Sequence, residues 1–593
     1  MRTAEKPKNV KIRRSSRYTI CDSYILTLLG NVPMRMKTFS ISAAAILPMV
    51  LFCAGSNLLR SASPELQALT GLVSSSQEGP MEGVLVSARK AGSTVTVTVV
   101  TDSTGRYSFP RNRLEPGQYA LKIRAVGYDL DDPGSLEIAS GKTITADLKL
   151  HKTADLASQL SNTEWMLSVP GTEDQKKSLL GCVQCHTLQR VIQSKHDEEQ
   201  FGKVLERMAG WTNASFPPHP QKKAADRLRE TRGAQLIQNR QMMAKYLSSI
   251  NLGSRSALNF DLKTLPRPTG KATHVIVTEY YLPRKIIEPH DVILDSDGMA
   301  WFSDFGEQVL GKLDPRTGQV TEIPIPVLKP GAATGSLGLQ SDKDGNLWLG
   351  MMFQGGVAKY DRTTGKFQTW SVPADYNLAM TQIDMVEPQS TFVDGKVWTQ
   401  NNGFAAIHRL DLTTGQVETF DFFRDEKEGE NHNIYDVIPD SKNNAYFTDF
   451  QNEHIGRVDA KTGKMTLFAT PTLRSQPRRG QMDSQDRLWF GEYRGNRIGM
   501  FDTRTERFEE WVAPTPFSAP YDVVLDKNGE AWTGSMSTDR VLRLNPKTGE
   551  FIEYPLPRST NIRRVFVDNS AATPSLWVGN NHGASIVKVE PLD

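Results

Sequence analysis

A short turn motif repeats along the second half of the chain and limits the folds open to it. Asp-x-x-Thr-Gly or a close variant recurs at intervals of 43 to 50 residues, at Asp314, Asp361, Asp411, Asp459, Asp502 and Asn545. One aromatic residue stands at the same place in each unit: Trp301, Trp348, Trp398, Tyr446, Trp489, Trp532 and Trp577. A period of about 40 to 50 residues with several short strands per unit is typical of a β-propeller. The pattern predicts seven blades over residues 272–593.

The first segment of this region is expected to close the ring. The last repeat supplies only three predicted strands before Asp593. Residues 275–283 (VIVTEYYLP) match the predicted outer strands 320–326 and 551–557. We therefore expect residues 275–283 to complete the last blade, which removes an open sheet edge.

The repeat register also predicts which residues meet at the central mouth of the propeller. An inner hairpin that turns at Asp297 places His290 opposite Asp304. The same offset pairs Leu337 with Met351, Glu387 with Asn401, Tyr435 with Asp449, Arg478 with Glu492, Tyr521 with Ser535 and Arg563 with Asn580. Convergent titratable groups in a concave site are the default place to look for function. The alternative is a hydrated polar rim without activity.

The repeats resemble the virginiamycin B lyase (streptogramin lyase) family over about 320 residues. The strings Leu488–Glu492 and Asn496–Gly499 are similar to its blade strings, and Glu288-Pro289-His290 with Asp304 resembles its Glu-Pro-His motif and later carboxylate. The resemblance implies Mg²⁺ bound by Glu288 and Asp304, and His290 as the general base that opens a cyclic depsipeptide at its ester. Asp304 stands where the family has Glu, the match falls in the first unit, and Arg563 replaces a second His.

A second motif, Cys182-Val183-Gln184-Cys185-His186, carries its own chemistry. Two cysteines at this spacing can bond to the vinyl groups of one haem, and the following His can bind its iron. Half of a zinc site is one alternative, but no Cys follows Cys185. A thioredoxin-type dithiol is another, but no βαβ pattern surrounds the motif. The motif predicts covalent haem c at Cys182, Cys185 and His186.

Residues 153–255 change from a two-residue to a helical period, with helices predicted over 198–208 and within 224–250. With the haem motif placed on the first helix, the segment resembles a small cytochrome c domain. Met208 is the first candidate for the sixth iron ligand, followed by His219 and then by Met242 or Met243. Each Met is equally suited to core packing.

Residues 66–152 predict a small Ig-like β-sandwich, because short β-branched runs alternate with turn clusters. The stretch from Thr101 to Phe109, with Leu114–Tyr119 and Ala125–Tyr128, resembles the carboxypeptidase regulatory-like domain. This resemblance implies an accessory module, sometimes grouped with carbohydrate-binding sandwiches. The expected fold class is thus multidomain and mainly β: a sandwich, a small α-helical cytochrome c-like domain and a seven-bladed propeller.

Residues 1–65 have the pattern of a leader. Arg35 and Lys37 precede an apolar run, ISAAAILPMVLFC, that is followed by small residues and is too short to span a membrane. Met34 or Met36 then fits the initiator, and periplasmic or other export of a bacterial protein is expected. An uncleaved membrane anchor is the alternative. Removal of the leader leaves Cys182 and Cys185 as the only cysteines, which excludes structural disulfides.

Three function classes remain open. The first is an exported redox protein that passes electrons through haem to or from chemistry at the mouth or a partner protein. The second is a Mg²⁺-dependent lyase with an accessory haem domain, and the third is a scaffold that binds a glycan or peptide. The net charge of +3 and the pI of about 8.4 give no sign of nucleic-acid binding.

Overall fold

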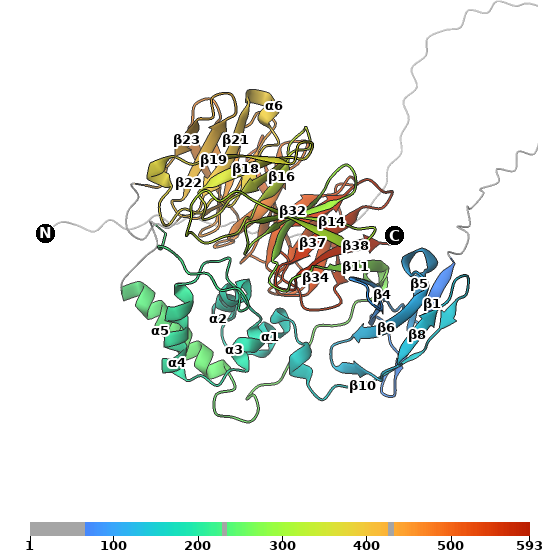
Figure 1. The fold of residues 1–593 in the computed structure, drawn as a ribbon. Helices are drawn as coiled ribbons and strands as arrows, with labels where there is room; N and C mark the ends of the chain where they lie inside the picture. Colours follow the sequence, from blue (N-terminus) through green and yellow to red (C-terminus); the bar gives the residue numbers. More distant parts are fainter. Residues whose placement is uncertain (1–65, 228–233, 425–431) are drawn as a thin grey trace, which may run out of the picture. The chain divides into compact units, whose positions relative to one another are not determined.

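The structure is a computed structural model that describes residues 66–227, 234–424 and 432–593 (Figure 1). The predicted signal sequence, start site and membrane anchor lie outside these residues. Among the described helices, none is long and apolar enough to cross a membrane. The described residues all belong to one compact unit.

Seven β-sheets of the propeller follow one another along the chain, which confirms the predicted blade number (Figure 1). Blades one to three contain β12 (Pro289–Leu294), β13 (Ala300–Asp304), β14 (Val309–Asp314), β15 (Gln319–Pro324), β16 (Leu339–Ser341), β17 (Leu347–Gly350), β18 (Gly356–Asp361), β19 (Lys366–Ser371), β20 (Val386–Glu387), β21 (Lys396–Asn401), β22 (Ala406–Asp411) and β23 (Val417–Phe420), with α6 (Thr391–Asp394) before β21. Blades four to six contain β24 (Ile434–Pro439), β25 (Ala445–Asp449), β26 (His454–Val458), β27 (Met465–Ala469), β28 (Pro477–Met482), β29 (Arg487–Glu492), β30 (Arg497–Asp502), β31 (Arg507–Val512), β32 (Pro520–Leu525), β33 (Ala531–Ser535), β34 (Arg540–Asn545) and β35 (Glu550–Pro555). Blade seven contains β36 (Val565–Asp568), β37 (Ser575–Asn580), β38 (Ser585–Pro591) and β11 (Val275–Tyr281).

The predicted ring closure is confirmed. Strand β11 pairs antiparallel with β38, from Val275 opposite Pro591 to Tyr281 opposite Ser585. On its other side β11 pairs with β4 (Val95–Val100) of the N-terminal sandwich. The outer edge of blade seven is therefore covered, and this blade and half of the sandwich form one eight-stranded sheet.

In four blades, a hydrogen bond explains why a tryptophan recurs at the same place in the repeat. Its indole N–H donates to an Asp at the turn of the inner hairpin, as in Trp301 to Asp295 at 2.8 Å. The same bond joins Trp348 to Asp342, Trp489 to Asp483 and Trp532 to Asp526. A buried indole N–H needs an acceptor, so the pair holds each inner hairpin in place.

The sandwich is present as expected, with strands β1 (Gln67–Ser75), β2 (Gly79–Pro80), β3 (Leu85–Lys90), β4, β5 (Arg106–Pro110), β6 (Gly117–Arg124), β7 (Tyr128–Leu130), β8 (Ser135–Ile138), β9 (Ile144–Thr145) and β10 (Leu148–Lys152). Its core contains Val73, Val86, Tyr107, Phe109 and Leu148. One sheet is built around β1, and the other joins blade seven through β4.

The segment that follows the sandwich is helical. It contains η2 (Leu156–Gln159), α1 (Asn162–Ser168), α2 (Glu173–Ser178), η3 (Leu179–Gln184), α3 (Leu188–Ile192), α4 (Glu198–Ala209) and α5 (Ala234–Ile250). The helix predicted over 198–208 is confirmed as α4. The prediction that the Cys-His motif lies on the first helix is wrong. Residues 182–184 are the last three of the 3₁₀-helix η3, which follows two short α-helices, and Cys185 caps the end of η3.

Candidate functional site

A ring of buried charges fills the centre of the propeller. Asp291 on β12 accepts hydrogen bonds from Arg479 of blade five at 2.7 and 3.1 Å and from Arg564 before blade seven at 2.9 Å. Asp436 lies 3.9 Å from Arg479, and Asp522 lies 3.8 Å from Arg564. Burial would raise the pKa of Asp291, but the two guanidinium groups lower it well below its ordinary value. The ring joins side chains from five blades of the propeller.

His290 is fully buried beside this ring, and both of its ring nitrogens have partners. Its Nδ1 lies 2.7 Å from the Asp291 carboxylate and its Nε2 lies 3.3 Å from the Tyr521 hydroxyl. Burial lowers the pKa of His290 to about 3, so the imidazole is neutral near pH 7. We assign Nδ1–H as the donor to Asp291 and Nε2 as the acceptor from Tyr521. Neither nitrogen is free to take a proton from a substrate in this arrangement.

Glu288 and Asp304 do lie together, as predicted. Asp304 Oδ1 accepts from the backbone N–H of Glu288 at 3.4 Å and of Gly306 at 3.0 Å. Glu288 Oε2 and Asp304 Oδ2 are buried without a hydrogen-bond partner among the described residues. Burial raises the pKa of Glu288 well above its ordinary value and that of Asp304 to about 7.

The two carboxyl groups fit only part of a metal site. In the part of the chain that the structure describes, no group of three or more His, Cys, Asp or Glu side chains is placed to hold a metal ion. Mg²⁺ usually binds one or two protein carboxylates and keeps several waters. Glu288 and Asp304 therefore remain the predicted Mg²⁺ ligands, with water or substrate needed to complete the site.

The helical segment packs directly on the mouth of the propeller. Asn561 Nδ2 donates to the backbone oxygen of Val183 at 2.9 Å, and the Tyr493 hydroxyl donates to Leu180 O at 3.0 Å. Arg563 donates to Gln184 O at 2.6 Å, and its guanidinium lies 4.5 Å from the centre of the Phe305 ring. Side chains of the mouth thus hold the Cys-His motif. Of these side chains, the repeat register predicts only Arg563 at the mouth.

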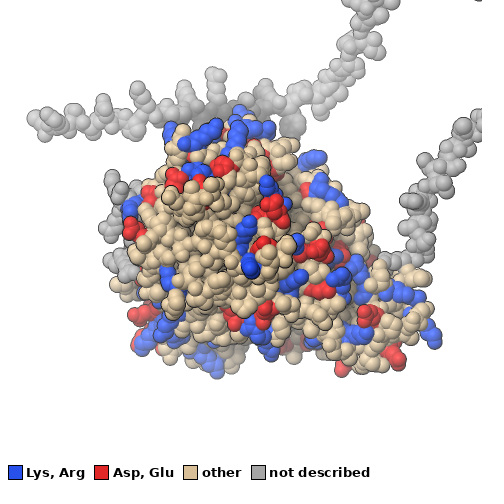
Figure 2. All heavy atoms as spheres, turned by 45° about the horizontal axis from the view of Figure 1, so that its top comes forward, with Lys and Arg blue, Asp and Glu red and all other residues tan. Residues whose placement is uncertain are grey.

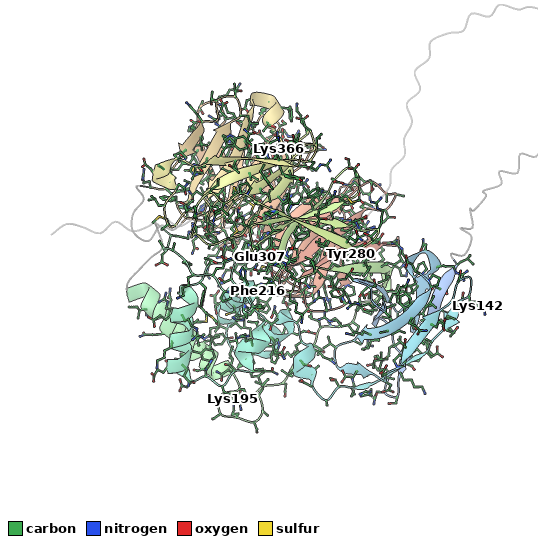
Figure 3. All side chains as sticks on the ribbon, viewed as in Figure 1. Lys142, Lys195, Phe216, Tyr280, Glu307 and Lys366 are labelled. Carbon is green, nitrogen blue, oxygen red and sulfur yellow. The ribbon has the colours of Figure 1, made fainter. Side chains whose placement is uncertain are left out.

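Phe216 makes a further contact between the helical segment and the propeller (Figure 3). Figure 3 labels Phe216 close to Glu307 of the propeller. The Phe216 ring stacks on His582 with centroids 5.8 Å apart and an interplanar angle of 5°. Nearby, a Cβ on Gly306 would lie 2.7 Å from Glu288 Oε2 and 2.8 Å from His219 Nδ1. A larger residue at this position would require the Glu288 or His219 side chain to shift.

The Cys-His motif lines a cavity of about 550 Å³ that Phe216 lines as well. Its walls are mostly apolar, and the volume lies within the range of about 300 to 1,000 Å³ usual for cofactor sites. The lining residues used below are Cys182, Cys185, His186, Arg190, Arg207, Met208, Trp211, Phe216, Lys223 and Met243.

The three side chains of the predicted haem motif line this cavity together. Cys182 and Cys185 are free thiols, and burial raises the pKa of both, to about 12 for Cys182. His186 Nδ1 lies 3.1 Å from the backbone oxygen of Thr187. An Nδ1–H bond to a carbonyl leaves Nε2 as the nitrogen for a metal and fixes the ring orientation. These residues fit a covalently attached haem.

The structure separates the candidates for the sixth ligand. Met208 on α4 and Met243 on α5 both line the cavity, and Met208 is 40% exposed. His219 and Met242 are not among its lining residues, and Met242 is 55% exposed. Met208 stays the first prediction, and Met243 becomes its main competitor.

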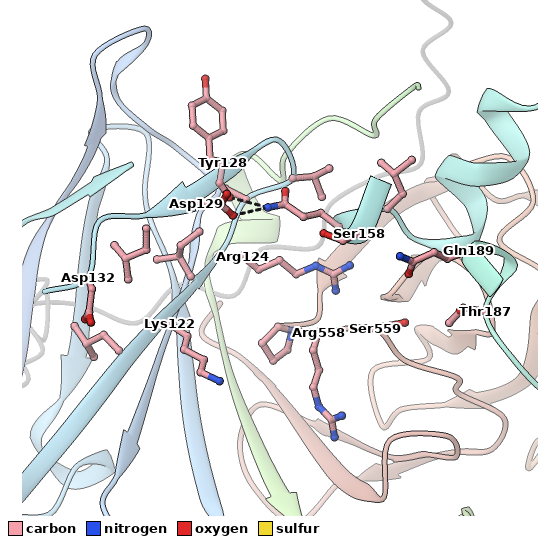
Figure 4. Close-up of a pocket in the computed structure, with 18 residues that line it drawn as sticks. Lys122, Arg124, Tyr128, Asp129, Asp132, Ser158, Thr187, Gln189, Arg558 and Ser559 are labelled. Atoms are coloured by element: carbon pink, nitrogen blue, oxygen red, sulfur yellow. Dashed lines mark hydrogen bonds between the residues drawn. The ribbon is translucent and has the colours of Figure 1, made fainter. Parts of the chain in front are cut away.

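A second cavity, of about 610 Å³, lies between the sandwich, the helical segment and the propeller (Figure 4). Gln159 donates to Tyr128 O and Asp129 Oδ1 at one side of it. The guanidinium groups of Arg124 and Arg558 bond to Asp539 and Glu279 of the propeller. Arg124 thus joins the sandwich to the propeller, whereas the Arg558 contact lies within the propeller.

In five blades, a mouth residue predicted from the repeat register lies one position before the residue that belongs to the charged ring. A β-bulge in β12 places Pro289 opposite Asp304, and the same shift occurs in β24, β28 and β32. The predicted pair of Glu387 with Asn401 is wrong, because Glu387 pairs with Trp398 and Asn401 pairs with Ala406. The Asp or Arg that follows the mouth position in five blades was the available signal: Asp291, Asp436, Arg479, Asp522 and Arg564.

The comparisons with known proteins find matches for the N-terminal sandwich and the C-terminal propeller. Residues 428–592 match the virginiamycin B lyase family. Residues 68–151 match the carboxypeptidase regulatory-like domain. The protein therefore contains a virginiamycin B lyase-like domain and a carboxypeptidase regulatory-like domain, and neither match covers the Cys-His motif.

Three solved structures are similar to part of the chain at low identity. A catalytically inactive virginiamycin B lyase from Staphylococcus aureus with quinupristin is 21% identical, covers 53% of this chain and 99% of its own, and has a TM-score of 0.45. A streptogramin B lyase is 22% identical with 54% and 99% coverage and a TM-score of 0.45. The extracellular domain of a putative hybrid two component system from B. thetaiotaomicron is 16% identical, with 52% and 42% coverage and a TM-score of 0.40. A search of curated proteins gives no match.

The low pKa of His290 predicts a pH-dependent contribution to stability. The unfolded state binds a proton at an ordinary His pKa of about 6.5, whereas burial keeps the folded pKa at about 3. The contribution of His290 is therefore present above pH 6.5 and is lost as the pH falls toward 3, by up to about 1.4 kcal/mol per pH unit. The free energy of unfolding of the wild type minus that of His290→Gln should decrease as the pH is lowered from 6.5 toward 3. A difference that is constant with pH would contradict the buried neutral imidazole.

Proposed function

We propose that the protein is an exported c-type haem protein that exchanges single electrons through haem attached to Cys182 and Cys185. The observation that carries the proposal is the cavity that brings both thiols, His186, two methionines and aromatic walls together. A bound haem supplies a one-electron redox centre in this pocket. The electron partner is a protein or small molecule that approaches the exposed side of the cavity.

The chain's own residues give the pocket its order. Thr187 O orients His186 so that Nε2 is available for iron, and Trp211 and Phe216 contribute aromatic surface to the apolar walls. Contacts of Val183 and Gln184 with Asn561 and Arg563 hold the motif on the propeller. A rigid support of this kind favours fast electron exchange, because little rearrangement accompanies the change in charge.

The proposal is tested on full-length protein expressed with haem-attachment machinery. We expect a mass above that of the bare mature chain by one haem, a Soret band, and a reversible reduced-minus-oxidised spectrum. Bare-chain mass and absence of a Soret band under these conditions would exclude the proposal. The family matches concern the propeller and sandwich, so this measurement decides the haem question independently of them.

The sixth ligand has its own test. A Met ligand opposite His raises the haem reduction potential, so Met208→Ala should lower the midpoint potential and remove the Met-to-iron charge-transfer band. Met243→Ala is the matched control, because Met243 lines the same cavity from α5. Loss of the band in Met243→Ala alone would assign the ligand to Met243 instead.

A Mg²⁺-dependent carbon–oxygen lyase is the second candidate. The family match over residues 428–592 favours it, as do the unpartnered oxygens of Glu288 and Asp304 beside the mouth. The engaged nitrogens of His290 and the helical segment on the mouth oppose it. A glycan- or peptide-binding scaffold is the third, for which the groove beside the sandwich is the available surface.

Quinupristin with Mg²⁺ separates these candidates. The redox proposal predicts no ring opening by the wild type. A lyase would open the ring, lose this activity in His290→Ala and keep it in His186→Ala. Binding without product in all three proteins would instead support the scaffold.

A further inference from the structure

The cavity that carries the Cys-His motif has a one-sided charge. Three cationic side chains, Arg190, Arg207 and Lys223, line it, and no Asp or Glu is among its 18 lining residues. Elsewhere the surface mixes both signs, as Figure 2 shows for one face. Among the described residues, none of these three cations forms an ion pair with an Asp or Glu side chain.

Backbone contacts place two of the cations together. Arg207 lies in the last turn of α4, and the N–H of Gly210 donates to Arg207 O at 3.2 Å. The N–H of Lys223 in turn donates to Gly210 O at 2.9 Å. The helix end and the extended segment around Lys223 therefore meet at one edge of the cavity.

Arg190 lies at a different position in the cavity. It follows the motif on α3, and burial together with the nearby Arg190 guanidinium lowers the pKa of His186. The cations thus form two groups: Arg190 beside the proximal His, and Arg207 with Lys223 at the end of α4. Arg190 and Arg207 are exposed, whereas the apolar walls lie deeper.

We infer that Arg207 and Lys223 bind the two propionate groups of the haem. This inference rests on the proposed haem function. It adds an orientation of the porphyrin, in which the edge with the thioether bonds lies at η3 and the edge with the propionates lies at the end of α4. Arg–carboxylate contacts are charge-assisted and can be bidentate, and the cationic pair matches a dianionic edge. The opposite charge also keeps a carboxyl pKa low, by about 1 to 3.

Lys222 provides a matched control. Trp211 and Lys222 form a β-bridge, Lys222 is exposed, and it is not among the lining residues although Lys223 is. Successive side chains of an extended segment point to opposite sides, so Lys222→Gln removes the same charge facing away from the cavity.

The experiment measures the midpoint potential of the holoprotein between about pH 5 and pH 8 at low ionic strength, where surface charges are least screened. The wild type and Lys222→Gln should give the same nearly flat profile. Arg207→Gln/Lys223→Gln should keep its covalent haem but have a lower potential that falls further as the propionates ionise within this range. Arg207→Lys/Lys223→Arg should restore the wild-type profile.

Arg190→Gln separates the two groups of cations. It should lower the potential through the lost charge beside His186 without adding a pH dependence. A double variant at Arg207 and Lys223 with the profile of Lys222→Gln would overturn the inference. Wild-type protein without covalent haem would instead overturn the proposed function, so the two failures are distinguishable.

Discussion

Cys182→Ser/Cys185→Ser is expected to abolish covalent haem attachment completely. Serine has the size of cysteine but no thiol to form a thioether bond, so no other residue in the cavity can replace it. The double variant should have the mass of the bare mature chain after denaturation and lose the Soret band during purification. The other described residues contain no cysteine, so no alternative thiol is present in them.

Two further variants make this result specific. Thr187→Ala changes the residue after His186, but the contact to His186 uses its backbone oxygen, so haem should be retained. His186→Ala should keep both thioether bonds and lose the proximal ligand, which changes the spectrum and the midpoint potential rather than the mass. Retention of haem mass in Cys182→Ser/Cys185→Ser would contradict the assignment.

Much of the fold follows from local repetition in the sequence. The spacing of the Asp-x-x-Thr-Gly turns predicts the blade number, and the likeness of residues 275–283 to later outer strands predicts the closure that β11 and β38 form. Both features depend on contacts within a blade or between neighbouring repeats. The pairing of β11 with β4 was not predictable, because one strand's outer edge gives no signal of its partner.

The mouth was predicted less well, for two physical reasons. A bulge shifts the register by one residue, and a shift of one residue exchanges the two faces of a strand. The sequence therefore points to His290 and Arg478, whereas the ionic ring is formed by the residues that follow them. Complementary Asp and Arg residues at that next position are the pattern that identifies it.

The docking of the Cys-His motif on the propeller was not predictable at all. The contact between Asn561 and Val183 joins residues 378 positions apart, and it uses a backbone oxygen that no sequence pattern marks. This contact also changes the meaning of the lyase resemblance. The backbone oxygens of Leu180 and Gln184 also accept hydrogen bonds from Tyr493 and Arg563, so a substrate at the mouth would lie beside this segment.

Asp291→Asn is expected to have the largest effect on stability. The substitution keeps the shape of the side chain but removes the charge that Arg479 and Arg564 share, and Asp291 and Arg479 are almost completely buried. Removing one partner of a buried ion pair leaves an uncompensated charge and costs about 3 to 5 kcal/mol. The denaturant midpoint of the propeller, followed by tryptophan fluorescence, should fall accordingly.

Asp297→Asn is the matched control, because Asp297 is exposed at the turn of the same hairpin. Its effect should stay within about 0.5 kcal/mol, as for most surface substitutions. Equal midpoints for the two variants would mean that Asp436 and Asp522, at 3.9 and 3.8 Å from the guanidinium groups, balance both cations alone. Those longer contacts would then join blade four to blade five and blade six to blade seven, and His290 Nδ1 would lose its carboxylate partner without consequence for the fold.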